Sequence, residues 1–309
     1  MKTAPTLTGV LCAFVFSTTL LILNGCATAL DHTLSKGNDD SLPLDAKPLD
    51  DSLYVFDFIR GKTMSAEQKA KQWSEMGYKG VAVGLRKPHD IPRIKAYLAT
   101  PEVKSGKFSI SVVLLPMKVS ADGIWDDIWK QSLVLTPTTD LWPIIHNNRK
   151  LTKKQVVSVL KEMCIEAAKV GTDVVIYPHD GTFIESVEEA IPYVKEVAMP
   201  NLYLTMHLAH ELRAGNGDRL LEVATKAAPY LKHASISGAN KIIDPRAGKD
   251  WSDVIKPLDE GEFPLEEFID ALEKINFNSK MFLHTFGIKQ PINQHLPRSY
   301  KKWKELVKP

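Results

Sequence analysis

The stretch "NLYLTMHLAHEL", residues 201–212, decides how this chain is read. Its apolar and polar residues alternate from Leu202 to Thr205, a pattern typical of a β-strand. His207 and His210 then follow, three residues apart, where the strand should end. They are either metal ligands at the open end of a barrel or polar residues at the end of a buried strand, and the rest of the chain must distinguish the two.

The N-terminus carries the pattern of an export signal. The apolar run "GVLCAFVFSTTLLIL" at 9–23 is shorter than the roughly 20 residues of a membrane-spanning helix, which favours a signal-peptide core over an uncleaved membrane anchor. The motif "LNGC" at 23–26 resembles the lipobox of bacterial lipoproteins. The sequence therefore predicts a signal peptide over 1–25, a lipidated Cys26 on a flexible tether over 26–51, and a domain over 52–309. The mature protein is expected in the periplasm or at the cell surface, anchored to the membrane by this lipid.

Composition limits the class of partner. The chain has 309 residues, a formal net charge of +2 and 25% charged residues, so no basic patch predicts nucleic-acid binding. Of the three cysteines, Cys12 is lost with the signal peptide and Cys26 takes the lipid, which leaves Cys164 without a disulfide partner. A small neutral or mildly polar molecule is the expected partner.

From residue 53 onward, β-rich runs alternate with amphipathic helical stretches such as 65–78, which opens on Ser65. The expected strands are 53–58, 80–85, 108–115, 132–137, 172–179, 201–207, 233–240 and 280–287. Strands separated by helices pair in parallel, so this order predicts an α/β fold of the (β/α)8 TIM-barrel type. A doubly wound open sheet is the alternative, but no G-x-G-x-x-G follows the first strand.

Polar residues end several of these strands in the second half of the chain. In a TIM barrel the chemistry lies at the C-terminal ends of the strands, where His179, His207, His210 and His284 are expected. Neutral imidazole suits zinc, nickel, cobalt or iron better than magnesium or calcium, which prefer oxygen ligands. Each histidine also has a simpler interpretation, as a hydrogen-bonded structural residue.

Several segments carry a resemblance to a known family. They are "VVIYPHDGTFIESVEEAIPYVKEVAMPNLYLTMHLAHEL" at 174–212, "SISGAN" at 235–240, "PLDEGEFPLEEFIDAL" at 257–272 and "FLHTFGIK" at 282–289. Together they resemble the xylose-isomerase-like TIM barrels, also called sugar phosphate isomerases/epimerases, over residues 172–306. The resemblance implies a divalent metal, such as zinc, manganese, cobalt or nickel, at the ends of strands five to eight. This metal would polarise a sugar carbonyl or its neighbouring hydroxyl.

The chain departs from the family pattern at the expected ligands. Tyr177 and His179 stand where the fifth strand often ends in Glu, His207 where the sixth often ends in Asp, and His284 where the eighth often ends in Glu. His210 matches a family histidine three residues after the sixth-strand ligand. The expected metal ligands are therefore these four histidines.

Other residues are candidates for catalysis or substrate binding. His179 and His207 could move protons, Glu211 could orient a ligand or act as a base, and Lys289 could stabilise an enolate-like oxygen or be a solvated loop lysine. Trp142 is expected in a loop near the fourth strand, where it could stack on a sugar. The full set of expected substrate-binding residues is Asp57, Arg60, Trp142, Asn240 and Arg298, the last of which could instead cap the closing helix.

The expected export address favours a free sugar, an oxidised sugar or a glycoside as the substrate, and no phosphate-binding loop is present. The resemblance implies a metal-assisted removal of a proton next to a carbonyl. Isomerisation, epimerisation and elimination from a 3-keto-glycoside all fit that chemistry. The alternative is a sugar-binding lipoprotein without catalysis, because the acidic ligands of the family are replaced.

Overall fold

The computed structural model describes residues 48–58, 64–120, 122–147, 150–240 and 250–308. The predicted signal peptide, Cys26 and Arg60 lie outside this part of the chain. Among the described residues, no helix is both long enough and apolar enough to cross a membrane.

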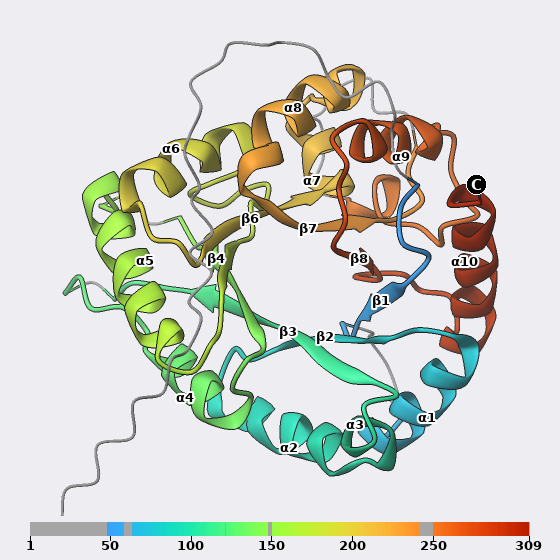
Figure 1. The fold of residues 1–309 in the computed structure, drawn as a ribbon, viewed down its shortest axis with the longest axis horizontal. Helices are drawn as coiled ribbons and strands as arrows, with labels where there is room; N and C mark the ends of the chain where they lie inside the picture. Colours follow the sequence, from blue (N-terminus) through green and yellow to red (C-terminus); the bar gives the residue numbers. More distant parts are fainter. Residues whose placement is uncertain (1–47, 59–63, 121, 148–149, 241–249, 309) are drawn as a thin grey trace, which may run out of the picture. The chain divides into compact units, whose positions relative to one another are not determined.

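Eight parallel strands close into a barrel, which confirms the predicted TIM-barrel fold (Figure 1). Each strand pairs with the next along the chain, and the last pairs with the first through Leu53 and Met281. The strands are β1 (Leu53–Phe56), β2 (Gly80–Gly84), β3 (Ser109–Met117), β4 (Asp140–Ile145), β5 (Val174–Ile176), β6 (Leu202–His207), β7 (Leu231–Ile236) and β8 (Lys280–Leu283).

Helices form the outer ring around the barrel in Figure 1. They are α1 (Ala66–Met76), α2 (Ile91–Ala99), α3 (Pro101–Lys104), α4 (Ile128–Leu135), α5 (Lys153–Ala168), α6 (Val187–Val197), α7 (Leu208–Arg213), α8 (Leu220–Ala227), α9 (Leu265–Lys274) and α10 (Ile292–Leu306). The predicted start of α1 is confirmed, because Ser65 and Gln68 form a reciprocal capping box there.

The fourth strand is not where the sequence predicted it. The run at 132–137 lies mostly in α4, which buries Ile128, Trp129, Ser132 and Leu133 on one side. The true strand, β4, contains Pro143, and a proline weakens a strand pattern in the sequence. All six residues of β4 are buried, so it forms a normal wall of the barrel.

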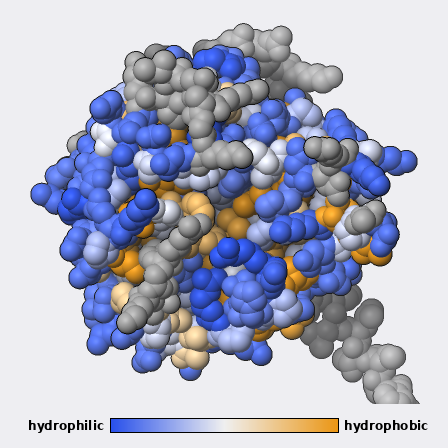
Figure 2. All heavy atoms as spheres, turned by 180° about the vertical axis from the view of Figure 1, so that it is seen from behind, coloured by the Kyte–Doolittle hydropathy of each residue, from blue (hydrophilic) through white to orange (hydrophobic). Residues whose placement is uncertain are grey.

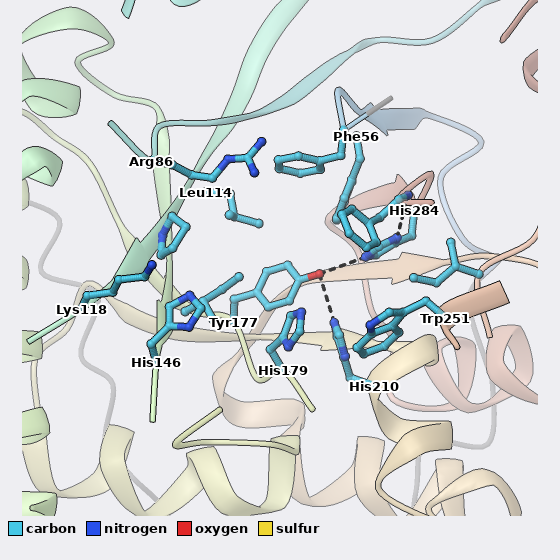
Figure 3. Close-up of a pocket in the computed structure, with 15 residues that line it drawn as sticks. Phe56, Arg86, Leu114, Lys118, His146, Tyr177, His179, His210, Trp251 and His284 are labelled. Atoms are coloured by element: carbon cyan, nitrogen blue, oxygen red, sulfur yellow. Dashed lines mark hydrogen bonds between the residues drawn. The ribbon is translucent and has the colours of Figure 1, made fainter. Parts of the chain in front are cut away.

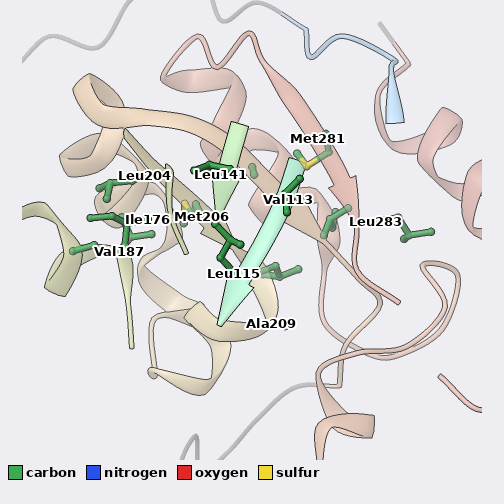
Figure 4. Packing of buried hydrophobic residues seen from close by; sticks show 14 of the residues in the cluster. Val113, Leu115, Leu141, Ile176, Val187, Leu204, Met206, Ala209, Met281 and Leu283 are labelled. Carbon is green, nitrogen blue, oxygen red and sulfur yellow. The ribbon is translucent and has the colours of Figure 1, made fainter. Parts of the chain in front are cut away.

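Two buried layers stabilise the barrel. The larger one lies between strands and helices and includes Val113, Leu141 and Leu204 (Figure 4). The smaller one fills the barrel axis and consists of Phe56, Ala82, Val112, Leu114, Trp142, Ile144, Val175, Tyr177 and Phe282. On the face that Figure 2 shows, hydrophilic residues surround a more hydrophobic middle.

Trp142 belongs to this axial layer, which corrects its predicted place in a loop. Its side chain is fully buried, and its indole Nε1 donates to Nδ1 of His233 at 2.8 Å. Nε2 of His233 lies 3.1 Å from a carboxylate oxygen of Asp140. Trp142 therefore fills the barrel core and does not line the pocket described below.

Candidate active site

A cavity of about 350 Å³ opens at the C-terminal ends of the strands (Figure 3). That volume lies within the range of pockets that bind small molecules. Its polar and basic lining residues are Arg86, Lys118, His146, Tyr177, His179, His210 and His284. Its apolar and aromatic lining residues are Phe56, Phe58, Leu114, Pro116, Ile144, Trp251, Ile255 and Phe286. The barrel thus brings together side chains that follow all eight strands.

The hydroxyl of Tyr177 lies between two histidines at the centre of the site. Its oxygen is 3.2 Å from Nε2 of His284 and 3.3 Å from Nε2 of His210, as the dashed lines in Figure 3 mark. The three side chains come from the ends of β5, β6 and β8. Closure of the barrel is what brings these distant parts of the chain together.

Backbone amides fix the proton positions of both histidines. Nδ1 of His210 accepts from the backbone N–H of Asp180 at 3.4 Å, and Nδ1 of His284 accepts from that of Phe286 at 3.3 Å. Burial lowers the pKa of His284 to about 3 and places that of His210 well below its usual value, so both rings are neutral at neutral pH. A neutral imidazole that accepts at Nδ1 carries its proton on Nε2. Both histidines therefore donate to the Tyr177 oxygen.

This arrangement makes Tyr177 a hydrogen-bond donor toward the pocket. Burial raises the pKa of its hydroxyl well above the usual value, so the hydroxyl keeps its proton at neutral pH. Because its oxygen already accepts from His210 and His284, its own proton is available to a bound molecule. Negative charge that develops on the oxygen during a reaction would meet two N–H donors.

His179 presents a free nitrogen to the same pocket. Its Nδ1 is 2.7 Å from the backbone carbonyl of Asp180, so Nδ1–H donates and Nε2 keeps its lone pair. The ring lies 4.2 Å from that of His210, centroid to centroid. Burial lowers the pKa of His179, which keeps the ring neutral near pH 7. His179 is therefore positioned to accept a proton.

The peptide of Asp180 orients both of these histidines, and its side chain is held in turn. Arg213 forms an ion pair with the Asp180 carboxylate at 3.2 Å. Gly181 follows with φ of 77°, a conformation that favours glycine. The hydroxyl of Thr182 then donates to the carbonyl of His179 at 2.7 Å. The turn after β5 is therefore fixed by contacts at each step.

The predicted four-histidine metal site is not present in this arrangement. Within the described part of the chain, no three His, Cys, Asp or Glu side chains are grouped so as to hold a metal ion. A bound metal needs the lone pair of each imidazole, whereas Nε2 of His210 and of His284 carries a proton and faces the Tyr177 oxygen. The residues therefore do not fit a shared divalent ion.

His207 answers the question raised by the stretch at 201–212. Its ring stacks on Tyr177 with centroids 3.7 Å apart, its Nδ1 is hydrogen-bonded to the Ser235 hydroxyl, and it is 1% exposed. It does not line the pocket, whereas His210 does. One of the two histidines is thus a core residue beneath the site, and the other is part of its wall.

Two more predicted catalytic residues lie outside the pocket lining. The carboxylate of Glu211 accepts from the backbone N–H of Val187 at 2.9 Å and from the Asn216 amide at 2.6 Å. Burial raises its pKa to about 7. In this structure Glu211 therefore connects α6 to the segment after α7. Lys289, the other of the two, is exposed on the loop after β8.

The predicted substrate-binding residues have other partners. Asp57 turns away from the barrel axis, where it binds Lys69 at 2.6 Å and the Tyr97 hydroxyl at 3.0 Å. The Asn240 amide donates to Asp253 at 3.1 Å. Arg298 pairs with Glu260 at 2.7 Å, which agrees with the alternative of a structural role near the closing helix. None of these lines the pocket.

Sequence reasoning missed Tyr177 as a functional candidate, together with Arg86, Lys118 and His146. Lys118 and His146 directly follow β3 and β4, and Arg86 stands two residues after β2. The strand-end rule applied to the first half of the chain would therefore have found all three. His146 was hidden because the fourth strand was placed too early. Trp251 lies in the long segment after β7 and has no comparable signal.

Comparisons with known proteins agree with the fold. A family described as "Xylose isomerase-like TIM barrel" matches residues 132–306. The structure of the probable 3-DHS dehydratase AsbF from Bacillus anthracis is similar, with a TM-score of 0.63, 14% identity, and 81% of this chain and 97% of that chain covered. D-psicose 3-epimerase from Clostridium cellulolyticum H10 gives a TM-score of 0.60, 14% identity, and coverages of 83% and 98%.

A protein described as AP endonuclease, family 2 from Brucella melitensis gives a TM-score of 0.58, 18% identity, and coverages of 81% and 97%. None of the curated proteins matches this chain. At these identities the structural likeness shows the fold.

Proposed function

We propose, because the chain belongs to the xylose isomerase-like TIM-barrel family, that it is a sugar isomerase or epimerase. Its reaction would move a proton on the carbon next to a carbonyl. The observation that carries this proposal is the pairing of a proton donor with a proton acceptor in one pocket. Tyr177 is a hydroxyl donor supported by two imidazoles, and His179 offers a free Nε2 beside it.

The first step forms an enediol. The substrate carbonyl oxygen accepts the Tyr177 hydroxyl proton, and His179 Nε2 takes the proton from the adjacent carbon. The electron pair of the broken C–H bond becomes the new C=C bond. The Tyr177 oxygen is left with negative charge, which the N–H groups of His210 and His284 stabilise.

The second step returns the protons. The His179 imidazolium gives its proton back to carbon, while Tyr177 recovers one from an enediol hydroxyl. Delivery to the neighbouring carbon gives an isomer. An epimer forms when the proton reaches the opposite face of the original carbon, which requires the enediol to turn over in the pocket before His179 returns the proton. No metal enters these steps, because the residues present do not fit a shared ion.

The apolar walls support a sugar as substrate. Phe58, Trp251 and Phe286 line the cavity, and aromatic rings pack against the apolar faces of sugars. The ring of Trp251 lies 5.4 Å from His179 and 5.2 Å from His210, centroid to centroid. A sugar packed on Trp251 would therefore reach both the proton acceptor and the Tyr177 hydroxyl.

A second candidate is a sugar-binding protein without catalysis. It is favoured by the pocket lining, which includes no Asp or Glu among the described residues.

In either case we propose that the protein is an exported lipoprotein attached through Cys26, which the "LNGC" motif after the apolar run at 9–23 supports. Mass spectrometry of the native N-terminus tests the proposed export and lipidation, since an intact Met1 would contradict them.

Solvent deuterium exchange tests the proposed reaction. The protein is incubated in D2O with a panel of aldoses, ketoses, uronates and 3-keto-glycosides, and carbon-bound deuterium is followed by NMR. We expect exchange at one carbon next to a carbonyl, with loss of this exchange in Tyr177→Phe. Saturable sugar binding without exchange on any member of the panel would favour the binding protein.

A further inference from the structure

Arg86 differs from the other arginines that the structure describes. Arg93, Arg213, Arg219 and Arg298 each form an ion pair with a carboxylate. Arg86 lines the pocket and has no ion-pair partner among the described residues. Its guanidinium instead lies over the ring of Phe58, 5.9 Å from the ring centroid. Arg86 is an exposed residue of the lining, so its charge is open to a bound molecule and is not neutralised by a carboxylate of the described residues.

Lys118 is a second such cation in the same wall. It follows β3, next to the strand that precedes Arg86, and it too has no ion-pair partner within the described ranges. After burial, the charge of Lys118 is what lowers the pKa of the neighbouring His146. With His179, His210 and His284 neutral, these two side chains give the lining a net positive charge.

The two cations lie apart from the reacting groups. Arg86 and Lys118 follow β2 and β3, whereas Tyr177, His179, His210 and His284 follow β5, β6 and β8. In Figure 3, Arg86 and Lys118 are on one side of the Tyr177 hydroxyl, and Trp251 and His284 are on the other. One molecule in the cavity could therefore contact both groups with different parts.

Charge decides what such a molecule should be. Arg86 and Lys118 are both exposed, so water hydrates their charges and a bound molecule can reach them. A neutral sugar would bring no opposite charge to this end of the pocket. A carboxylate would pair with them, and the planar guanidinium of Arg86 can bind both of its oxygens. An acidic group is thus favoured at this end of the pocket.

We infer that the substrate is an acidic sugar, whose carboxylate binds Arg86 and Lys118 while its carbonyl lies at Tyr177. The sugar part of this inference rests on the proposed function, and the anionic part rests on the two cations. Sulfate and phosphate esters share the same charge, so the experiment below includes an ester beside the carboxylate.

Calorimetric titration at pH 7.5 tests the inference with D-glucuronate, D-glucose 6-sulfate and D-glucose. We expect glucuronate to bind about tenfold more tightly than glucose, because charge-assisted hydrogen bonds are the stronger kind, and added salt should reduce this preference. Arg86→Gln and Lys118→Gln should each reduce it several-fold, and Arg86→Lys should keep part of it. Lys301→Gln removes the same charge from an exposed site on α10 and should leave the preference unchanged.

The possible outcomes separate the inference from the proposed function. Equal affinity for glucuronate and glucose, no binding of glucuronate at millimolar concentration, or a preference that survives the double variant would each overturn the inference. A stronger preference for the sulfate ester would keep the anion site and assign it to esters. Charge-dependent binding without deuterium exchange would contradict only the proposed reaction, whereas exchange confined to neutral sugars would contradict only the inference.

Discussion

The hydroxyl oxygen of Tyr177 lies 3.2 Å from Nε2 of His284, although 107 residues separate the two in the chain. Each side chain follows a strand of the barrel, and the contact exists only because the sheet closes on itself. The proton positions set by the backbone make His284 the donor and Tyr177 the acceptor. Because the Tyr177 oxygen is the acceptor in this contact, the hydroxyl's own proton is available to a molecule in the pocket.

Replacing Tyr177 with Phe should therefore reduce catalysis more than stability. The aromatic packing is kept, but the reacting proton is lost, so we expect the exchange rate to fall about 10² to 10³-fold. The donors of His210 and His284 would lose their acceptor, at a cost of about 1–3 kcal/mol in the free energy of unfolding. Exchange kinetics and urea unfolding measure the two effects.

Tyr203→Phe is the matched control for this variant, because Tyr203 lies on β6 outside the pocket lining. It should exchange like the wild type. An exchange rate in Tyr177→Phe that equals the rate in this control would show that the Tyr177 hydroxyl takes no part.

The pH dependence of kcat/KM should report the protonation of His179. Only the neutral ring can accept a proton, and burial lowers its pKa below the usual 6.5. Activity should therefore be constant around neutral pH and fall in acid, with a midpoint below 6.5. A rate that increases as the pH decreases would contradict the role of His179 as the base.

Removal of divalent ions is expected to leave the exchange rate unchanged. The nitrogens of His210 and His284 that a metal would need carry protons and face Tyr177. Exchange after dialysis against a chelator, with metal analysis of the same sample, provides the measurement. Loss of activity on dialysis and its recovery with zinc or manganese would restore the metal-assisted reaction that the resemblance implies.

Glu211→Gln should change stability rather than turnover, because Glu211 lies outside the pocket lining. Burial raises its pKa from 4.5 to about 7, so the protonated carboxyl is favoured in the folded state. Its stabilising contribution is complete below pH 4.5 and is lost as the pH rises through 7, by about 3 kcal/mol above that pH.

In Glu211→Gln this pH dependence of the free energy of unfolding should disappear, as measured by urea denaturation at pH 5 to 8. Glu75→Gln on the exposed side of α1 serves as the control. A large loss of exchange activity with an unchanged stability profile would instead support the catalytic role predicted from the sequence.

The fold could be predicted because buried strands and capped helices leave local patterns. The failure at the fourth strand has a local cause as well. The run at 132–137 is apolar enough for a strand, but its buried residues follow helical spacing in α4, and Pro143 conceals the true strand. Only the packing of the whole barrel decides between the two.

The sequence could predict which residues stand at the ends of the strands, but not the direction in which each side chain points. His179, His210 and His284 were found because they follow strand ends. Asp57 also follows a strand, yet its neighbour Phe56 points into the barrel, so Asp57 must point outward, since side chains alternate along a strand. The depth of His207 beneath Tyr177 depends on how the strands are staggered, which no local pattern records.

The filled barrel axis has a consequence for kinetics. Phe282, Trp142 and Phe56 pack against one another in the barrel axis, and His207 stacks on Tyr177. These rings fill the axis of the described barrel beneath the cavity, so we expect substrate and product to pass through the same opening at the C-terminal ends of the strands. Neither can enter until the other has left. Inhibition by product should therefore be purely competitive, and the net rate should slow as product accumulates well before the substrate is exhausted.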